Sequence, residues 1–164
     1  MNGISLVLEP KPIWFGADDE IFDSTELASI FSRKERAALR FLLRPASRRM
    51  VQEMMIKHTS RQRVCRFVDG RKEFIDEDTL DQISFVDDMI DLIVLDWEGL
   101  LDEENRPIPC ERKNKLALIN AYPRLGTAIL DAAGSAAVRH EQIKEESEKN
   151  LPGSPSGFTT GSGA

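Results

Sequence analysis

Apolar side chains recur every three or four residues between positions 83 and 97. At about 100° per residue, this spacing places five of them on one stripe of a helix: Ile83, Val86, Ile90, Ile93 and Trp97. A second apolar set falls on roughly the opposite side: Phe85, Leu92 and Leu95. A helix that is apolar on two sides is either buried between two layers or presents one face to a partner. We therefore expect the central helix of the fold here, beginning near Thr79 and ending at Gly99.

The N-terminal third of the chain predicts short strands and short helices. Residues 4–8 form a short, mainly apolar run that precedes prolines, which is typical of an edge strand. A short helix begins after Asp23 or Ser24, either of which can cap it, and Ser32 opens the capping-box pattern of another. Residues 40–44 fit either the end of that second helix or a strand that stops at the next proline.

The pair Asp69-Gly70, which lies between two apolar runs, predicts a tight β-hairpin. The flanking runs cover residues 64–68 and 74–75, and arginine and lysine surround them, so we expect a small basic hairpin. The acidic residues 76–78 that follow are expected to cap the central helix.

The C-terminal half predicts a surface loop and two further helices. The loop covers the polar residues 102–107, a short helix covers residues 111–121, and Pro123 suits the first turn of a long last helix. That last helix has a face of small and apolar side chains that permits close packing: Leu125, Ala128, Ile129, Ala132, Ala133, Ala136 and Ala137. Glycine, serine and proline dominate residues 151–164, which predicts a flexible tail.

These elements predict an α+β, mainly helical fold, with short N-terminal strands and a small basic hairpin packed with about four to five helices. A length of 164 residues suits one domain, which we expect over residues 1–150, followed by the flexible tail over residues 151–164. No apolar run reaches about eighteen residues and no signal-peptide pattern occurs. We therefore expect a cytoplasmic protein that does not bind membranes.

The formal charge of −6 conceals a strong asymmetry along the chain. Residues 33–72 hold thirteen Lys and Arg against three Asp and Glu, a net charge of +10, so the rest of the chain carries −16. A basic segment of this kind is one signal of nucleic-acid binding. Aromatic side chains are sparse among these charges, however, which favours solvated basic side chains over a nucleic-acid surface.

The sequence contains no pattern of catalytic or cofactor-binding residues. Glycine-rich phosphate loops, zinc-protease motifs and serine-hydrolase motifs are missing, and Cys65 and Cys110 lack the spacing of a metal site. Asp87, Asp88 and Asp91 point in different directions on the predicted helix, so we expect solvated acids rather than a cation site. We therefore expect a non-enzymatic protein with no catalytic residues, no metal and no cofactor.

Two apolar surfaces are typical of a binding protein. One is the second face of the central helix, with Phe85, Leu92 and Leu95, and the other is the pair Met54 and Met55 on the preceding helix. Methionine fills cores as well as adaptable surfaces, so core packing stays an alternative for that pair. These five residues are the candidate partner-binding residues, and the same surfaces also suit self-association.

One segment resembles the signature of a known family. The matching residues are Trp97, Gly99, Asp102, Pro107 and Asn114. Their order and spacing are similar to a motif in the tail assembly chaperones of long-tailed bacteriophages and prophages. Asn105 departs from the more frequent glycine of that family, although asparagine also adopts the left-handed turn conformation. Within the signature, a structural role is expected for Trp97, Gly99 and Pro107.

A second segment is similar to the strand-to-helix step of the same family: Phe41, Arg44, Pro45 and Ser47. The resemblance therefore favours a strand over residues 40–44, followed by a helix that Ser47 caps. It also implies a non-enzymatic assembly factor in the cytoplasm of the bacterial host. Such a factor binds the tape-measure protein and helps recruit tail-tube subunits during tail assembly.

Two other functions stay open at this point. One is a nucleic-acid-binding or regulatory protein that uses the basic segment 33–72, for which binding falls steeply with salt. The other is a structural tail component, which is retained in the finished virion.

Overall fold

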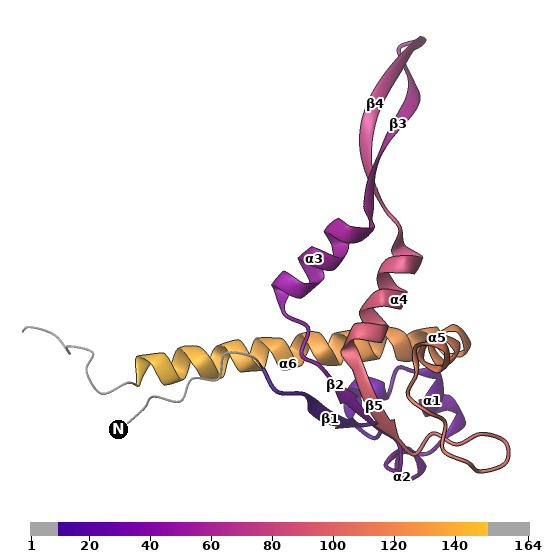
Figure 1. Cartoon of the computed structure of the whole chain (residues 1–164), viewed down its shortest axis with the longest axis vertical. Coiled ribbons are helices and arrows are strands. Elements are labelled where there is room, and N and C mark those ends of the chain that lie inside the picture. Colours follow the sequence, from indigo (N-terminus) through magenta and orange to yellow (C-terminus); the bar gives the residue numbers. More distant parts are fainter. Residues whose placement is uncertain (1–9, 151–164) are drawn as a thin grey trace, which may run out of the picture.

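A computed structural model describes residues 10–150, which form an α+β, mainly helical structure (Figure 1). The predicted strand over residues 4–8 and the predicted tail over residues 151–164 lie outside the described residues. The elements are β1 (Ile13–Gly16), the 3-10 helix η1 (Glu20–Phe22), α1 (Glu26–Ile30), α2 (Arg33–Arg36), β2 (Arg40–Leu43), α3 (Arg48–His58), β3 (Thr59–Val68), β4 (Arg71–Leu80), α4 (Gln82–Ile93), β5 (Val94–Glu98), α5 (Arg112–Ala121) and α6 (Pro123–Lys149). The predicted fold class is confirmed.

A three-stranded antiparallel sheet with the order β1-β2-β5 forms one side of the structure. Its central strand confirms the strand predicted over residues 40–44, and Phe41 of that strand pairs with Trp97 of β5. Ser47 follows β2 and caps α3 as expected, because its hydroxyl accepts a hydrogen bond from the backbone N–H of Met50 over 3.2 Å. The pairing of β2 with β5 links the N-terminal part of the described chain to the segment that follows α4.

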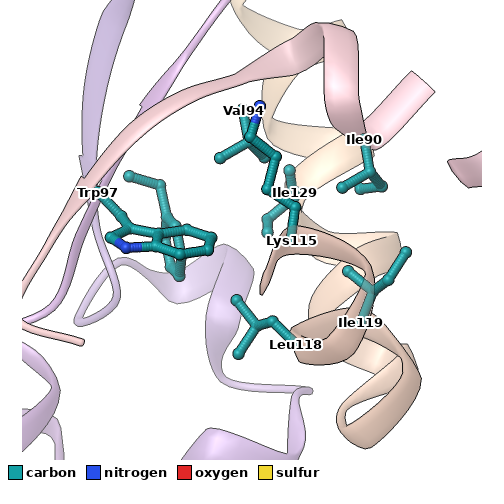
Figure 2. A pocket seen from close by; sticks show the side chains of 8 residues that line it. Ile90, Val94, Trp97, Lys115, Leu118, Ile119 and Ile129 are labelled. Carbon is teal, nitrogen blue, oxygen red and sulfur yellow. The ribbon is translucent and has the colours of Figure 1, made fainter. Parts of the chain in front are cut away.

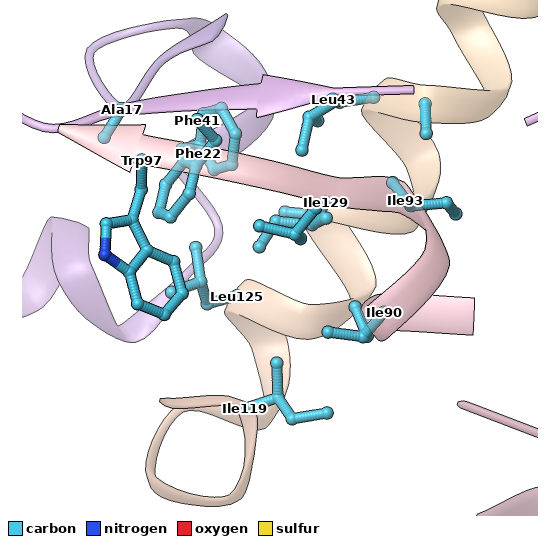
Figure 3. Packing of buried hydrophobic residues seen from close by; sticks show 14 of the residues in the cluster. Ala17, Phe22, Phe41, Leu43, Ile90, Ile93, Trp97, Ile119, Leu125 and Ile129 are labelled. Atoms are coloured by element: carbon cyan, nitrogen blue, oxygen red, sulfur yellow. The ribbon is translucent and has the colours of Figure 1, made fainter. Parts of the chain in front are cut away.

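The hydrophobic core lies between this sheet and α6 (Figure 3). The predicted small-residue face of α6 is buried: Leu125, Ala128, Ile129, Ala132, Ala133, Ala136 and Ala137. Alanine lets neighbouring backbone approach, and the N–H of Ala46 donates to the carbonyl of Ala133 over 3.0 Å. Glu26 of α1 accepts hydrogen bonds from the N–H groups of Arg124 and Leu125, so α1 supplies the N-terminal cap that α6 itself lacks.

The central helix ends earlier than its sequence pattern predicts. α4 stops at Ile93 rather than at Gly99, and residues Val94–Glu98 form β5 instead. Leu95 and Trp97, which the helical spacing placed on opposite helix faces, therefore lie on a strand. Apolar residues at spacings of three and four are compatible with a helix, but they do not determine the backbone conformation. Hydrogen bonding to β2 makes residues 94–98 a strand.

The same helix also begins later than predicted. Residues 76–79 belong to β4, and α4 begins at Gln82 after Asp81. The carboxylate of Asp81 accepts a hydrogen bond from the N–H of Ser84 over 3.2 Å, so this aspartate provides the cap that was expected from residues 76–78.

The predicted hairpin is present, and it projects from the rest of the structure (Figure 1). Asp69 and Gly70 have φ values of 50° and 76°, as a two-residue hairpin turn requires. Each strand has ten residues, so the hairpin extends well beyond the two apolar runs. Residues 59–80 hold five basic and five acidic side chains, which corrects the expected basic character. The acids at 76–78 continue β4 and pair opposite β3 instead of belonging to the helix.

The cap of α1 also differs from the prediction. Thr25 occupies the N-cap position, rather than Asp23 or Ser24. The carboxylate of Asp23 instead accepts a hydrogen bond from the buried guanidinium of Arg36 over 2.9 Å. This ion pair orients the carboxylate toward Arg36 rather than toward the N-terminus of α1. The capping box at Ser32 is confirmed.

Candidate partner-binding groove

An open groove of about 330 Å³ lies between α3 and α4, beside the end of β2 and the start of α5. Its lining is Arg44, Met54, Lys57, Asp88, Asp91, Leu92, Leu95 and Arg112. Figure 1 shows α3 and α4 side by side between the hairpin and the sheet. The groove brings together three of the five candidate partner-binding residues, namely Met54, Leu92 and Leu95.

The other two candidates do not line this groove. Met55 lies on α3 with 43% of its surface exposed, and Phe85 of α4 is half-buried against the hydrophobic core. The expected single face of Phe85, Leu92 and Leu95 is therefore wrong. Because α4 ends before Leu95, the strand brings this side chain beside Leu92 by a route that helical spacing does not describe.

Asp88 holds the charged side of the groove together. Lys57 Nζ and His58 Nε2 of α3 each lie 2.9 Å from its Oδ2 atom, and Arg112 Nη2 of α5 lies 2.8 Å from its Oδ1 atom. The hydrogen bonds from Lys57 and Arg112 hold the pKa of Asp88 well below its usual range. Only 17% of the Asp88 side chain is exposed, so this carboxylate links α3, α4 and α5 in a partly desolvated position.

Asp91 extends this network by one turn of α4. Lys115 Nζ lies 3.2 Å from its carboxylate and donates to its backbone carbonyl over 3.0 Å, while Arg112 Nη1 lies 3.1 Å from the carboxylate. Partial burial alone raises the pKa of Asp91, but the hydrogen bonds from Lys115 and Arg112 outweigh it and lower the pKa. The prediction of solvated acids is therefore wrong for Asp88 and Asp91.

Arg44 differs from the other cations of the groove because, among residues 10–150, it makes no ion pair with a carboxylate. It is exposed and lies on the same lining as the apolar side chains of Met54, Leu92 and Leu95. The groove therefore offers an apolar floor and, as far as residues 10–150 are concerned, one positive charge without a carboxylate partner. This combination suits a segment with an apolar face and an acidic side chain.

The signature residues hold the structure around β5 and the following loop. Trp97 is buried, and its Nε1–H donates to the carbonyl of Ile108 over 2.7 Å. Gly99 has a φ of +86° and lies against the backbone of Ala38, and Pro107 forms an isolated β-bridge with Leu101.

Trp97, Gly99 and Pro107 do not line the groove. Their contacts fix the turn and the loop that follow β5. Asn105, the position that departs from the chaperone signature, has a φ of 59°, which is the left-handed conformation that asparagine tolerates.

A second gap lies among core side chains (Figure 2). Its lining is Phe41, Ile90, Val94, Trp97, Lys115, Leu118, Ile119 and Ile129, and it has no volume for a water molecule. This gap is a feature of core packing rather than a ligand site. Within residues 10–150, no group of three or more His, Cys, Asp or Glu side chains is placed to hold a metal ion.

Sequence reasoning missed Arg44, Lys57 and Arg112 as residues of the groove. The available signal was the pair Asp88 and Asp91, three residues apart on a helix with two apolar faces, because partly buried carboxylates require nearby cations. Those cations come from α3 and α5, which are distant in sequence, so spacing alone cannot identify them.

The fold and the groove define an α+β protein with a mixed apolar and charged surface between two helices. The sequence model of the YdaY prophage protein family matches residues 36–150, which include the whole lining of the groove and the hairpin. The chain belongs to this family and is a prophage protein. No curated protein and no solved structure matches the chain. None of the helices between residues 10 and 150 is both long and apolar enough to cross a membrane.

Proposed function

We propose that this prophage protein is a non-enzymatic tail assembly chaperone. In this role it binds the tape-measure protein and helps to recruit tail-tube subunits in the cytoplasm of the bacterial host. The observation that carries the proposal is the groove, in which Met54, Leu92 and Leu95 share a lining with Arg44, which makes no ion pair with the described residues. Membership of a prophage family and the resemblance of the Trp97–Asn114 segment to the chaperone signature support it.

The groove suits an amphipathic helical segment of the tape-measure protein. Apolar side chains of such a segment cover Met54, Leu92 and Leu95, and an acidic side chain pairs with Arg44. The groove is open, which suits transient capture of apolar segments before tail-tube subunits replace the chaperone.

The basic segment 33–72 gives less support to nucleic-acid binding than its charge suggests. Seven of its thirteen cations lie within ion-pair distance of a carboxylate: Arg33, Arg36, Arg40, Arg49, Lys57, Arg63 and Arg66. Paired cations attract phosphate groups more weakly than free ones. Capture of the tape-measure protein depends mainly on the apolar floor of the groove, so it should persist when salt is raised.

Leu92→Asp is expected to weaken capture of the tape-measure protein by about tenfold or more, because it places a carboxylate on the apolar floor, beside the other floor residues Met54 and Leu95. Leu92 is only half-buried, so helical content should stay nearly unchanged. The test is co-expression of each variant with the tape-measure protein of the same gene cluster. Pull-down and solubility are then compared at low and high salt, with circular dichroism of the free variant.

Ile143→Asp is the matched control, since this isoleucine is 63% exposed on α6, outside the groove. It should capture the tape-measure protein like the wild type. Unchanged capture by Leu92→Asp would contradict a role for the groove. Nucleic acid that co-purifies and leaves at high salt, without any tape-measure protein, would favour the nucleic-acid alternative.

A further inference from the structure

The hairpin β3-β4 exposes more apolar surface than a solvated element needs. Phe67 is 70% exposed and Phe74 is 64% exposed, and both lie on the same face of the hairpin. Figure 1 shows that the hairpin projects away from the helices and the sheet, so residues 10–150 of this chain do not cover it. A two-stranded ribbon with both faces in water is marginally stable, and adding strands stabilises it.

Backbone geometry shows which atoms are free to pair along the outer edge of β4. Val68 and Arg71 flank the two-residue turn and form a hydrogen-bonded pair, so every second residue of β4 bonds to β3. The alternate residues of β4, namely Lys72, Phe74 and Asp76, do not bond to β3. Their N–H and C=O groups therefore point toward the open edge. These three backbones can accept another strand.

The charges of β4 are complementary to a second, antiparallel β4. The strand begins with Arg71 and Lys72 and continues to Asp76 and Glu77, with Phe74 midway between the two charged pairs. A two-fold axis through Phe74 places Lys72 opposite Asp76 and Arg71 opposite Glu77 of the second strand. Each of these contacts occurs twice, and no like charges lie directly opposite one another.

Other pairings of the same hairpin are less favourable. Moving the axis by one residue toward either end places Glu73 opposite Glu73 or Glu77 of the second strand. The edge of β3 carries Arg61, Arg63 and Arg66 without any acidic side chain, so two copies of β3 repel one another. Both the charges and the free backbone groups therefore select β4 with its axis at Phe74.

We propose that two copies of this chain pair through their β4 strands, antiparallel and with Phe74 on the two-fold axis. The two hairpins then form a continuous four-stranded sheet with the order β3-β4-β4-β3. On one face, Asp76 lies between Arg63 of its own β3 strand, which is 3.8 Å away, and Lys72 of the second copy. The two Phe74 rings lie side by side and lose much of their exposure to water.

This pairing is independent of the groove and of the chaperone function, because none of the groove residues belongs to β4. It places the two grooves on separate copies that the sheet joins. A dimer of this kind binds two segments of one long partner with a gain from effective concentration.

Charge reversal distinguishes loss of dimerisation from damage to the fold of a single chain. Lys72→Glu and Asp76→Lys should each weaken homodimerisation by about tenfold, because each places like charges opposite one another at two positions. A mixture of the two variants should form a heterodimer about as tight as the wild-type dimer, since both contacts become complementary again. Sedimentation equilibrium of the single variants and of the mixture measures this.

Lys144→Glu on the exposed end of α6 is the matched control and should dimerise like the wild type. Mixing restores nothing if the variants have only damaged their own hairpins, so a mixture that stays monomeric would overturn the proposal. A wild-type protein that is monomeric at high concentration would overturn it as well.

Disulfide formation then tests the register. Phe74→Cys should cross-link two chains on oxidation, because residue 74 faces its own copy across the axis at a Cα separation of about 5.5 Å. Ile75→Cys should not, since the same pairing places its two copies about 8 Å apart, beyond the reach of a disulfide. Both variants need Cys65→Ser, because Cys65 lies directly opposite Phe74 within the hairpin. Cross-linking at 75 but not at 74 would exclude this register.

Discussion

Replacement of Gly99 by alanine is expected to destabilise the protein by about 3 kcal/mol, the largest loss of stability that we predict for a single methyl group. Gly99 has a φ of +86°, which alanine adopts only with strain. A Cβ atom there would collide with the backbone carbonyl of Ala38, whose carbon lies only 2.8 Å away, and would lie 3.1 Å from Leu39 Cα. Backbone atoms cannot rotate away as a side chain can, so the turn after β5 and its contact with residues 38–39 must shift.

Gly134→Ala is the control for this substitution. Gly134 lies within α6, and an added Cβ atom there meets no atom within 4 Å. Alanine favours the helix over glycine, so this variant should gain about 0.5–1 kcal/mol. Urea denaturation of both variants, followed by circular dichroism, measures the two free energies of unfolding. Equal stability of Gly99→Ala and the wild type would show that the turn adapts without cost.

Asp88→Asn is expected to destabilise the protein by about 2 kcal/mol, because it removes the carboxylate that Lys57, His58 and Arg112 share. The substitution keeps the size of the side chain, so the loss reports charge rather than packing. α3 packs mainly against α4, and Lys57 and His58 of α3 contact the carboxylate of Asp88 there. Hydrogen exchange should therefore increase in α3 more than in α6.

Asp87→Asn is the matched control, since Asp87 is the preceding residue of α4 and makes no ion pair within residues 10–150. Its stability should stay within about 0.5 kcal/mol of the wild type. A loss at position 88 no larger than at position 87 would show that the network contributes nothing measurable.

The lowered pKa of Asp88 also gives the sign of the pH dependence. The folded protein binds the proton of this carboxyl less readily than the unfolded chain, whose aspartate pKa is about 3.9. The stabilisation from Asp88 is therefore fully present above about pH 5 and is lost as the pH falls through and below about 4. Urea denaturation at a series of pH values should show a smaller loss on acidification for Asp88→Asn than for the wild type.

The groove and the hairpin are adjacent in the chain. α3 leads into β3, and β4 leads into α4, so the helices that line the groove are the two ends of the hairpin. Dimerisation through β4 therefore joins two grooves without using any residue of their linings.

Elements with local signals were predictable from the amino-acid sequence. The Asp69-Gly70 turn, the capping box at Ser32, the cap at Ser47 and the helix start at Pro123 depend on backbone preferences of a few adjacent residues, and all four are present. The buried alanine face of α6 was also readable, because a helix of this length keeps its periodicity throughout.

The end of the central helix and the composition of the groove depend on contacts between distant parts of the chain. Apolar spacing between residues 83 and 97 is compatible with one long helix, and the strand begins at Val94 because β2, some fifty residues earlier, offers free backbone hydrogen bonds. The groove likewise combines Met54 and Lys57 of α3, Leu92 of α4 and Arg112 of α5. No periodicity along one element contains that information, since these contacts exist only once the chain has folded.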